Sequence, residues 1–320
     1  MKLYLDNRIF ELQAQGGISQ IWRNVTPHLK NVFYAADWHG REENIFIGTY
    51  YSAPPAGYVP IALIYDCIAE RYRPIGSHHP DALDKAQAIR SAHSVIGISH
   101  WTAYDVEQFY GKPCAVAYPG TTMRRADSIQ VAAFRARHNL HNPYVLVVGR
   151  RHLYKNVQAL YQAWDYWSGR DTHQLVCIGG EAPDYGDNLF AQKHPGTIRH
   201  LSLSDSDMAC ATSGATMLVY PSLYEGFGLP VLEALACGCP VVCGAVGAIP
   251  EIGLDIPYYA DVLRPLSIAQ AMTAALQPDM DRLMRGMERA KLFTWERMAQ
   301  QIVQAIQDIV QETVLNANLT

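Results

Sequence analysis

The sequence lacks any apolar run that approaches the roughly 20 residues that a membrane-spanning helix needs. It begins with Met1 and turns polar within its first residues, which is not typical of a secretory signal peptide. Its seven cysteines are odd in number and form no Cys-x-x-Cys pair, so the pattern indicates neither a disulfide framework nor an oxidising compartment. We therefore expect a soluble protein of the cytoplasm.

A large excess of one charge is absent too. The 26 basic and 30 acidic side chains give a formal net charge of −4, so no general attraction to nucleic acid or to anionic lipid is implied. The chain has 320 residues, of which 49% are apolar, and domains usually hold about 100–200 residues. We expect two domains, and any binding of phosphate must be local.

The most informative stretch is residues 217–242, which read MLVYPSLYEGFGLPVLEALACGCPVV. Residues 217–220 predict a buried strand, and a polar loop with glycines follows Pro221. Pro230 suits the start of a helix, because its missing N–H would have no partner there. Gly238 is expected to end that helix before a second buried strand. This order of strand, loop, helix and strand indicates an α/β fold.

Two carboxylates, Glu225 and Glu233, flank the predicted helix start. Gly226 and Gly228 allow backbone amides to approach a ligand, and the N-terminus of a helix favours an anion. A phosphate and a group rich in hydroxyls could therefore bind side by side. The alternative is that Glu225 is an ordinary loop residue and Glu233 an acid in the first turn of the helix.

Three cations follow the strand predicted at residues 144–149, namely Arg150, Arg151 and Lys155. They lie at the carboxyl edge of the predicted sheet, where open α/β sheets bind ligands, although a solvated loop has a similar composition. In the first half of the chain, Gly17 follows the first strand and Asp66 follows the strand at residues 61–65. A tight turn and a turn cap are the respective alternatives.

The 217–242 run resembles the signature of retaining glycosyltransferase family 4, which has the GT-B fold: two glutamates separated by seven residues within PSxxEGFGLPxxEAxACGxPVV. The resemblance implies that Glu225 binds hydroxyls of a donor sugar and that Glu233 holds the ribose of its nucleotide. It also implies that the segment after Glu225 meets the sugar and the diphosphate through Gly226, Phe227, Gly228 and Leu229.

Other parts of the chain resemble the family as well. The segment VGRRHLYKN is similar to the family's Gly-Arg…Lys-Asn segment, whose Arg and Lys hold the diphosphate; whether Arg150 or Arg151 points inward is left open. The family places a Gly-Gly pair, here ending at Gly17, opposite the donor diphosphate across an interdomain cleft. It seats the nucleotide base after the third strand of the second half, near Ser202. Asp66 is implied on the acceptor side, although Tyr65 replaces the family's usual histidine before it.

The resemblance thus predicts two Rossmann-like domains facing across a cleft. Residues 1–142 form the acceptor-side domain, residues 143–293 bind the sugar nucleotide, and a C-terminal helix in residues 294–320 crosses back to the first domain. The first half is short for the family, and the loss is expected between residues 31 and 60, which read as irregular.

We expect an enzyme that transfers a hexosyl group from a UDP- or GDP-linked sugar to a sugar or lipid-linked acceptor, with retention of configuration, in the synthesis of polysaccharides, glycolipids or glycoconjugates. No metal or other cofactor is expected, because arginine and lysine can neutralise the leaving diphosphate. Cys237, Cys239 and Cys243 fall at a helix end and in a buried strand, so they do not indicate a metal site. A homodimer is left open. The alternatives are a sugar-nucleotide 2-epimerase of the same fold and a non-catalytic sugar-nucleotide-binding protein.

Overall fold

A computed structural model describes residues 1–317 except 39–41, 73–79, 152 and 180–182. The chain forms two compact units. The first unit comprises Met1–Gly120 and Phe293–Thr320, and the second comprises Thr121–Leu292. The first boundary differs from the expected one, because residues 121–142 lie in the second unit. Helix α6 (Ser128–Arg137) packs there against α9 (Asp205–Ser213), with Phe134 fully buried.

The first unit is built on a five-stranded parallel sheet in the order β1-β2-β3-β4-β5. Residues 31–60, which we expected to be irregular, contribute the end of α2 and the whole of β2. That expectation was wrong because the short apolar run of β2 is held as a strand by its pairing with β1 on one side and β3 on the other. The strands are β1 (Leu3–Leu5), β2 (Asn44–Ile47), β3 (Tyr58–Ile64), β4 (Ser94–Gly97) and β5 (Ala115–Val116).

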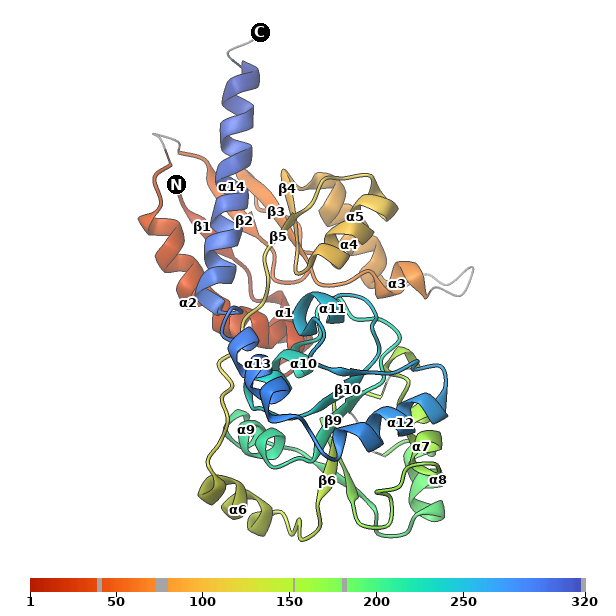
Figure 1. The fold of residues 1–320 in the computed structure, drawn as a ribbon. Coiled ribbons are helices and arrows are strands. Elements are labelled where there is room, and N and C mark those ends of the chain that lie inside the picture. Colours follow the sequence, from red (N-terminus) through yellow and green to blue (C-terminus); the bar gives the residue numbers. More distant parts are fainter. Residues whose placement is uncertain (39–41, 73–79, 152, 180–182, 318–320) are drawn as a thin grey trace. The chain divides into compact units, whose positions relative to one another are not determined.

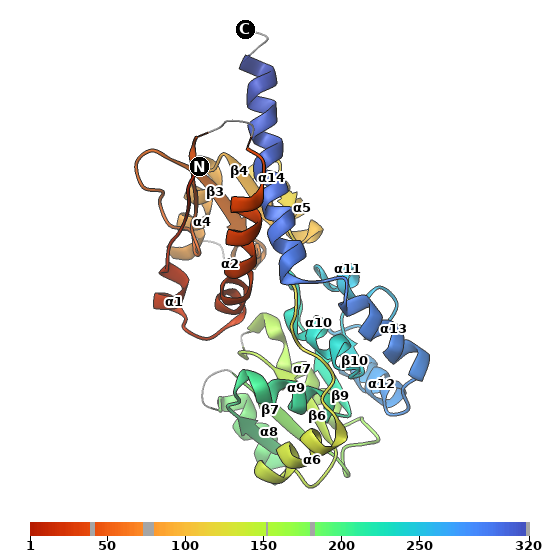
Figure 2. The ribbon, with the colours of Figure 1, turned by 90° about the vertical axis from the view of Figure 1, so that its left-hand side faces the viewer.

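Helices cover both faces of this sheet. Figures 1 and 2 show α2 and the C-terminal α14 side by side on one face, with α4 and α5 on the other. The apolar residues of α14 recur at helical spacing and bury Met298, Ile302 and Ile306, so the last helix completes the first unit, as predicted. The helices of the unit are α1 (Arg8–Leu12), α2 (Gly17–Ala35), α3 (Ile68–Arg71), α4 (Pro80–Ser91), α5 (His100–Tyr110) and α14 (Trp295–Ala317).

The second unit has a six-stranded parallel sheet in the order β11-β10-β9-β6-β7-β8. The expected strands at residues 144–149 and 217–220 appear in it as β6 and β9. The strands are β6 (Tyr144–Val148), β7 (Gln174–Ile178), β8 (Ile198–Leu201), β9 (Met217–Tyr220), β10 (Val241–Cys243) and β11 (Tyr258–Tyr259). Besides α6 and α9, the helices are α7 (Val157–Trp164), α8 (Tyr185–Lys193), α10 (Leu229–Ala236), α11 (Ile249–Gly253), α12 (Pro265–Ala275) and α13 (Met280–Ala290), and Leu153–Lys155 form one 3₁₀ turn.

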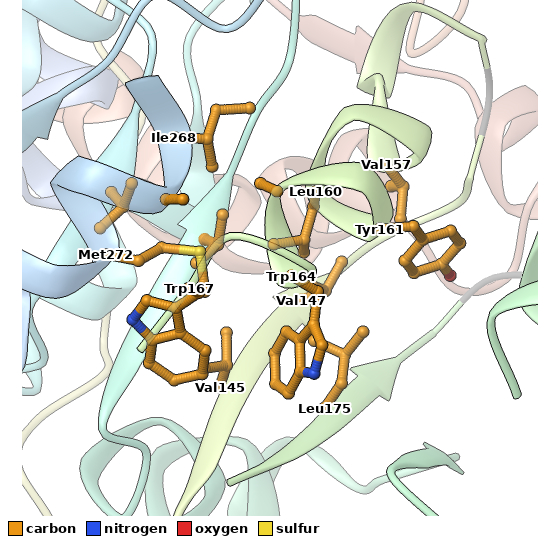
Figure 3. Close-up of a cluster of buried hydrophobic side chains, with 14 of the residues drawn as sticks. Val145, Val147, Val157, Leu160, Tyr161, Trp164, Trp167, Leu175, Ile268 and Met272 are labelled. Atoms are coloured by element: carbon orange, nitrogen blue, oxygen red, sulfur yellow. The ribbon is translucent and has the colours of Figure 1, made fainter. Parts of the chain in front are cut away.

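One core of the second unit lies between this sheet and helices α7 and α12. Val145 and Val147 are two positions apart in β6, so both side chains lie on the same face of the sheet and pack toward α7. Figure 3 shows them with Trp164 and Trp167, whose ring centroids are 5.0 Å apart and whose ring planes are inclined by 62°. Full burial of one such side chain contributes about 1.5–3 kcal/mol. This packing fixes where β6 ends and α7 begins, and that junction carries the basic segment.

Candidate functional site

The ammonium group of Lys155 lies at the centre of the candidate site. Its Nζ donates to Oε1 of Glu225 at 2.6 Å and to the hydroxyl of Tyr220 at 2.7 Å. The same nitrogen is 5.1 Å from the ring centroid of Tyr154, a distance typical of cation–π contacts. The structure therefore brings together two predicted residues that are 70 positions apart, Lys155 and Glu225, and adds two tyrosines that sequence reasoning missed.

Glu225 is 7% exposed, although it lies in a loop. Its carbonyl oxygen accepts a hydrogen bond from the amide of Ala248 at 3.0 Å, so the segment after β10 holds the loop after β9. Gly247 makes this approach feasible: a Cβ built on it would lie 2.2 Å from the carbonyl oxygen of Glu225. The ordinary-loop alternative for Glu225 therefore does not describe its surroundings.

The segments after β6 and β9 are joined through backbone groups. The amide of Leu223 donates to the carbonyl of Tyr154 at 2.7 Å. Asn156 has left-handed backbone geometry with φ of 53°, which asparagine tolerates better than most residues, and its side-chain amide donates to the carbonyls of Pro221 and Val262. Three carboxyl-end segments of the sheet are thus held in one arrangement around Lys155.

The two neighbouring arginines have different surroundings. Arg150 is exposed at the carboxyl end of β6. Arg151 is turned inward, where its Nε lies 2.7 Å from Oδ2 of Asp187 and only 6% of its side chain is exposed. Asp187, which is 1% exposed, also accepts a hydrogen bond from the hydroxyl of Tyr161 and lies 4.0 Å from His200. Burial has a large effect here, since it raises the pKa of Tyr161 far above its ordinary value and lowers that of His200.

The start of α10 carries the remaining predicted residues of the glycine-containing loop. Gly228 is the N-cap residue with φ of 101°, a conformation that favours glycine. Pro230 is the second helical residue, one later than expected, and Glu233 is the fifth, which places it in the second turn and corrects the first-turn alternative. Glu233 is 7% exposed. The residues from Gly226 to Leu229 are all buried, namely Gly226, Phe227, Gly228 and Leu229.

Three predicted residues remain, namely Ser202, Gly17 and Asp66. Ser202 is exposed and follows β8 directly. Gly17 and Asp66 belong to the first unit, where Gly17 opens α2 and Asp66 follows β3. Oδ1 of Asp66 accepts from the amide of Ile68 at 3.1 Å, which is the turn-capping role weighed as the alternative.

Tyr65, which replaces the histidine usual in the resembled family, is part of a buried network. Its side chain is 3% exposed, its hydroxyl accepts from the indole N–H of Trp22 at 2.6 Å, and it donates to the carbonyl of Thr49 at 2.6 Å. Burial raises its pKa far above the ordinary range, so the phenol stays protonated. In this structure Tyr65 ties together α2, the segment after β2 and the end of β3.

Metal ligands do not gather in the described part of the chain, where no group of three His, Cys, Asp or Glu side chains is placed to hold an ion. Two Asp-x-Asp sequences occur, at Asp205–Asp207 and at Asp279–Asp281, and both lie at helix N-termini. Asp207 pairs with Arg137, and Asp279 accepts the amide of Asp281. The described helices also include none that is both long and apolar enough to cross a membrane.

A hollow of about 890 Å³ lies elsewhere in the second unit, beside α6. It is lined by Arg125, Val131, Arg135, Leu140 and His141, among others. None of the predicted site residues lines it, so volume alone does not locate the chemistry of this chain.

The comparisons with known proteins agree with this arrangement. Residues 129–255 match the family model described as glycosyl transferases group 1. The chain is 35% identical over 173 residues to O-antigen chain mannosyltransferase B of Escherichia coli, and the match covers 51% of this chain and 45% of that relative. It is 27% identical over 190 residues to D-inositol 3-phosphate glycosyltransferase of Corynebacterium glutamicum (strain R), covering 53% and 44% respectively. The matched segments thus span less than half the length of these relatives.

Solved structures match more of the chain. The structure of Anabaena Alr3699/HepE in complex with UDP-glucose has a TM-score of 0.73 at 15% identity and covers 96% of this chain and 91% of that one. WaaG, described as a glycosyltransferase involved in lipopolysaccharide biosynthesis, has a TM-score of 0.66 at 14% identity and covers 97% and 98%. Residues 129–255 thus resemble the group 1 glycosyl transferases, in agreement with the predicted resemblance, and the predicted fold class is confirmed, since the two units have the GT-B fold.

Proposed function

We propose that the protein transfers a hexosyl group from a nucleotide-diphosphate sugar, bound on the second unit, to a hydroxyl of a sugar or lipid-linked acceptor. The observation that carries the proposal is the buried contact of Lys155 with Glu225 at the carboxyl edge of the sheet, the edge at which the exposed Arg150 follows β6. A cation and a carboxylate at one point suit a ligand that presents phosphate oxygens beside sugar hydroxyls. The names of the relatives, a mannosyltransferase and an inositol-phosphate glycosyltransferase, support glycosyl transfer.

In the proposed reaction the bond between the anomeric carbon and the diphosphate oxygen breaks, and positive charge grows on the sugar while negative charge grows on the diphosphate. Lys155, Arg150 and the amides at the start of α10 stabilise the leaving group, and these interactions strengthen as the charge develops. Glu225 accepts hydrogen bonds from donor hydroxyls, and Glu233 is assigned the ribose. The amides from Gly226 to Leu229 are assigned to sugar and diphosphate, and Ser202 to the base.

Retention of configuration is part of the proposal. The acceptor oxygen attacks the face from which the diphosphate departs, and the departing phosphate takes the acceptor's proton, so that one C–O bond forms as another breaks and no free proton is left over. No protein base is required for this step. We assign Asp66 and Gly17 of the first unit to the acceptor and the diphosphate, respectively, and their substitution by asparagine and alanine tests those roles.

The test is donor turnover by the full chain with UDP-glucose and GDP-mannose, each with and without simple glycoside and lipid-linked acceptors. Glu225→Ala should lower turnover about 5- to 150-fold, because it removes the partner of buried hydrogen bonds. Glu288→Ala is the matched control, since Glu288 forms an exposed ion pair with Lys291 at 2.6 Å in the same unit. Wild-type turnover in Glu225→Ala would overturn the assignment. Acceptor-free epimerisation of the donor would favour the 2-epimerase, and binding without turnover a non-catalytic role.

A further inference from the structure

Tyr220 is the last residue of β9 and was not singled out by any motif. We propose that it is a positioning residue that holds Lys155 where a donor diphosphate needs it, an inference that rests on the proposed function. Tyr220 would not touch the reacting atoms itself. It would act through the lysine.

One contact carries this role. The hydroxyl of Tyr220 accepts a hydrogen bond from Nζ of Lys155 at 2.7 Å, and the ring centroid lies behind that hydroxyl, 4.8 Å from the same nitrogen. A flexible lysine side chain has many conformations in water, and fixing it carries an entropic cost. Because β9 is a central strand paired on both sides, Tyr220 supplies a fixed point for the ammonium group.

The position of Tyr220 makes it a hydrogen-bonding phenol and not a base. It is 3% exposed, and burial, with the Glu225 carboxylate beside it, raises its pKa well above the ordinary value. A neutral phenol can accept from Lys155 without adding a second negative charge to Glu225. Because the phenol is neutral, it does not repel a diphosphate anion, so Lys155 can keep its hydrogen bond to Tyr220 when the diphosphate binds.

Tyr144 offers a matched comparison within the same sheet. It is also a buried strand tyrosine, and its hydroxyl donates to the carbonyl of Ala211 at 2.6 Å. Unlike Tyr220, it has its hydrogen bond to the backbone of α9, away from the lysine. Both variants lose the hydroxyl of a buried strand tyrosine and keep its ring, so any effect on stability alone should be similar in the two variants.

The experiment measures binding of UDP and GDP by calorimetry to the full chain. Tyr220→Phe keeps the ring and removes the hydroxyl, and should weaken diphosphate binding about tenfold, whereas Tyr144→Phe should leave it unchanged. In a Lys155→Met background, Tyr220→Phe should have no further effect, because a residue that acts only through Lys155 is silent without it.

A second measurement does not depend on binding. The rate at which acetic anhydride labels the amine of Lys155, followed by mass spectrometry, should rise in Tyr220→Phe and stay constant in Tyr144→Phe. This inference alone would be overturned if the wild type bound nucleotide and Tyr220→Phe bound it with the same affinity. It would also be overturned if Tyr220→Phe lost as much affinity in the Lys155→Met background as in the wild type. No binding of either nucleotide by the wild type would overturn the proposed function, and the inference with it.

Discussion

The Nε atom of Arg151 lies 2.7 Å from Oδ2 of Asp187, and 6% and 1% of the two side chains are exposed. Asp187 is anchored in turn, because its carboxylate accepts the amide of Asp184 and its own amide donates back to Asp184, in a capping box at the start of α8. Arg151 is therefore part of the framework between β6 and α8. The exposed Arg150, which directly follows Gly149, is left as the better candidate for the diphosphate.

Substitution of the two arginines should separate binding from stability. Arg150→Ala should weaken binding of UDP or GDP, more strongly at low salt, with little change in the free energy of unfolding. Arg151→Ala should lower the free energy of unfolding by about 3–5 kcal/mol, because it leaves the buried Asp187 without its cation. Calorimetry and urea unfolding measure the two effects.

Asp187→Asn is the control for the second effect, since it removes the charge of the partner and should destabilise the same contact. A pattern in which Arg151→Ala loses nucleotide affinity at unchanged stability, while Arg150→Ala loses neither, would reverse the assignment.

Much of the fold could be predicted from local sequence. The apolar run at β6 and the glycine at its end, like the run at β9 ending in Pro221, mark buried parallel strands by composition and punctuation alone. The Glu225 to Glu233 signature then identified the family, and the two-unit architecture followed from it. Each of these features can be recognised from a few tens of consecutive residues.

The rest depends on contacts between distant segments. Residues 121–142 are polar and were interpreted as the link between the halves, counted with the first, whereas α6 buries Phe134 in the second unit. Arg151 and Arg150 are indistinguishable as letters, and only Asp187, 36 positions away, separates them. Tyr220 reads as an ordinary strand residue until Lys155 is seen at its hydroxyl. The two predicted residues of the first unit, Gly17 and Asp66, stay predictions.

Gly247→Ala should reduce donor turnover by disturbing Glu225. A Cβ at this position would lie 2.2 Å from the Glu225 carbonyl oxygen and 2.8 Å from its amide nitrogen, and the φ of 55° is itself unfavourable for alanine. The loop must shift to relieve contacts with backbone atoms, and a displacement of about 1 Å can cost about 100-fold in rate. Turnover is compared under saturating donor.

Gly196→Ala is the matched control. Gly196 lies in the same unit with φ of 74°, but a Cβ there would meet nothing within 4 Å. It carries the conformational cost without the collision, so its turnover should stay at the wild-type level. Equal losses in both variants would mean that backbone strain, and not the approach to Glu225, explains the effect.

Mild acidification should destabilise the fold through His200. Burial lowers the pKa of His200 below its ordinary value of 6.5, and the cation of Arg151 acts in the same direction, against the attraction of Asp187. Because the unfolded chain then binds a proton more readily than the folded chain, this contribution to the free energy of unfolding is complete above pH 6.5. It falls as the pH drops below 6.5.

Urea unfolding at pH 8.0 and pH 6.0 measures this effect in a range where ordinary carboxylates hardly titrate. The difference in the free energy of unfolding between pH 8.0 and pH 6.0 should be smaller in His200→Gln than in the wild type. It should persist in His138→Gln, whose ring is also partly exposed and lies 3.9 Å from a carboxylate, that of Asp207. An unchanged pH dependence in His200→Gln would contradict the prediction.

Donor turnover should survive the removal of divalent metal. A metal-dependent transferase needs carboxylates placed on the diphosphate, but here Glu225 pairs with Lys155. In the two Asp-x-Asp sequences, Asp207 pairs with Arg137 and Asp279 caps α13. Lys155 and Arg150 supply the neutralising charge instead.

The measurement is turnover after extensive dialysis, with excess EDTA or with added magnesium or manganese. A small stimulation by either ion is compatible with relief of product inhibition, because free nucleoside diphosphate binds divalent ions. Complete loss of turnover in EDTA, restored by one ion, would contradict the charge-neutralising role assigned to Lys155 and Arg150, and would move the search for ligands to the acids at the carboxyl edge of the second sheet.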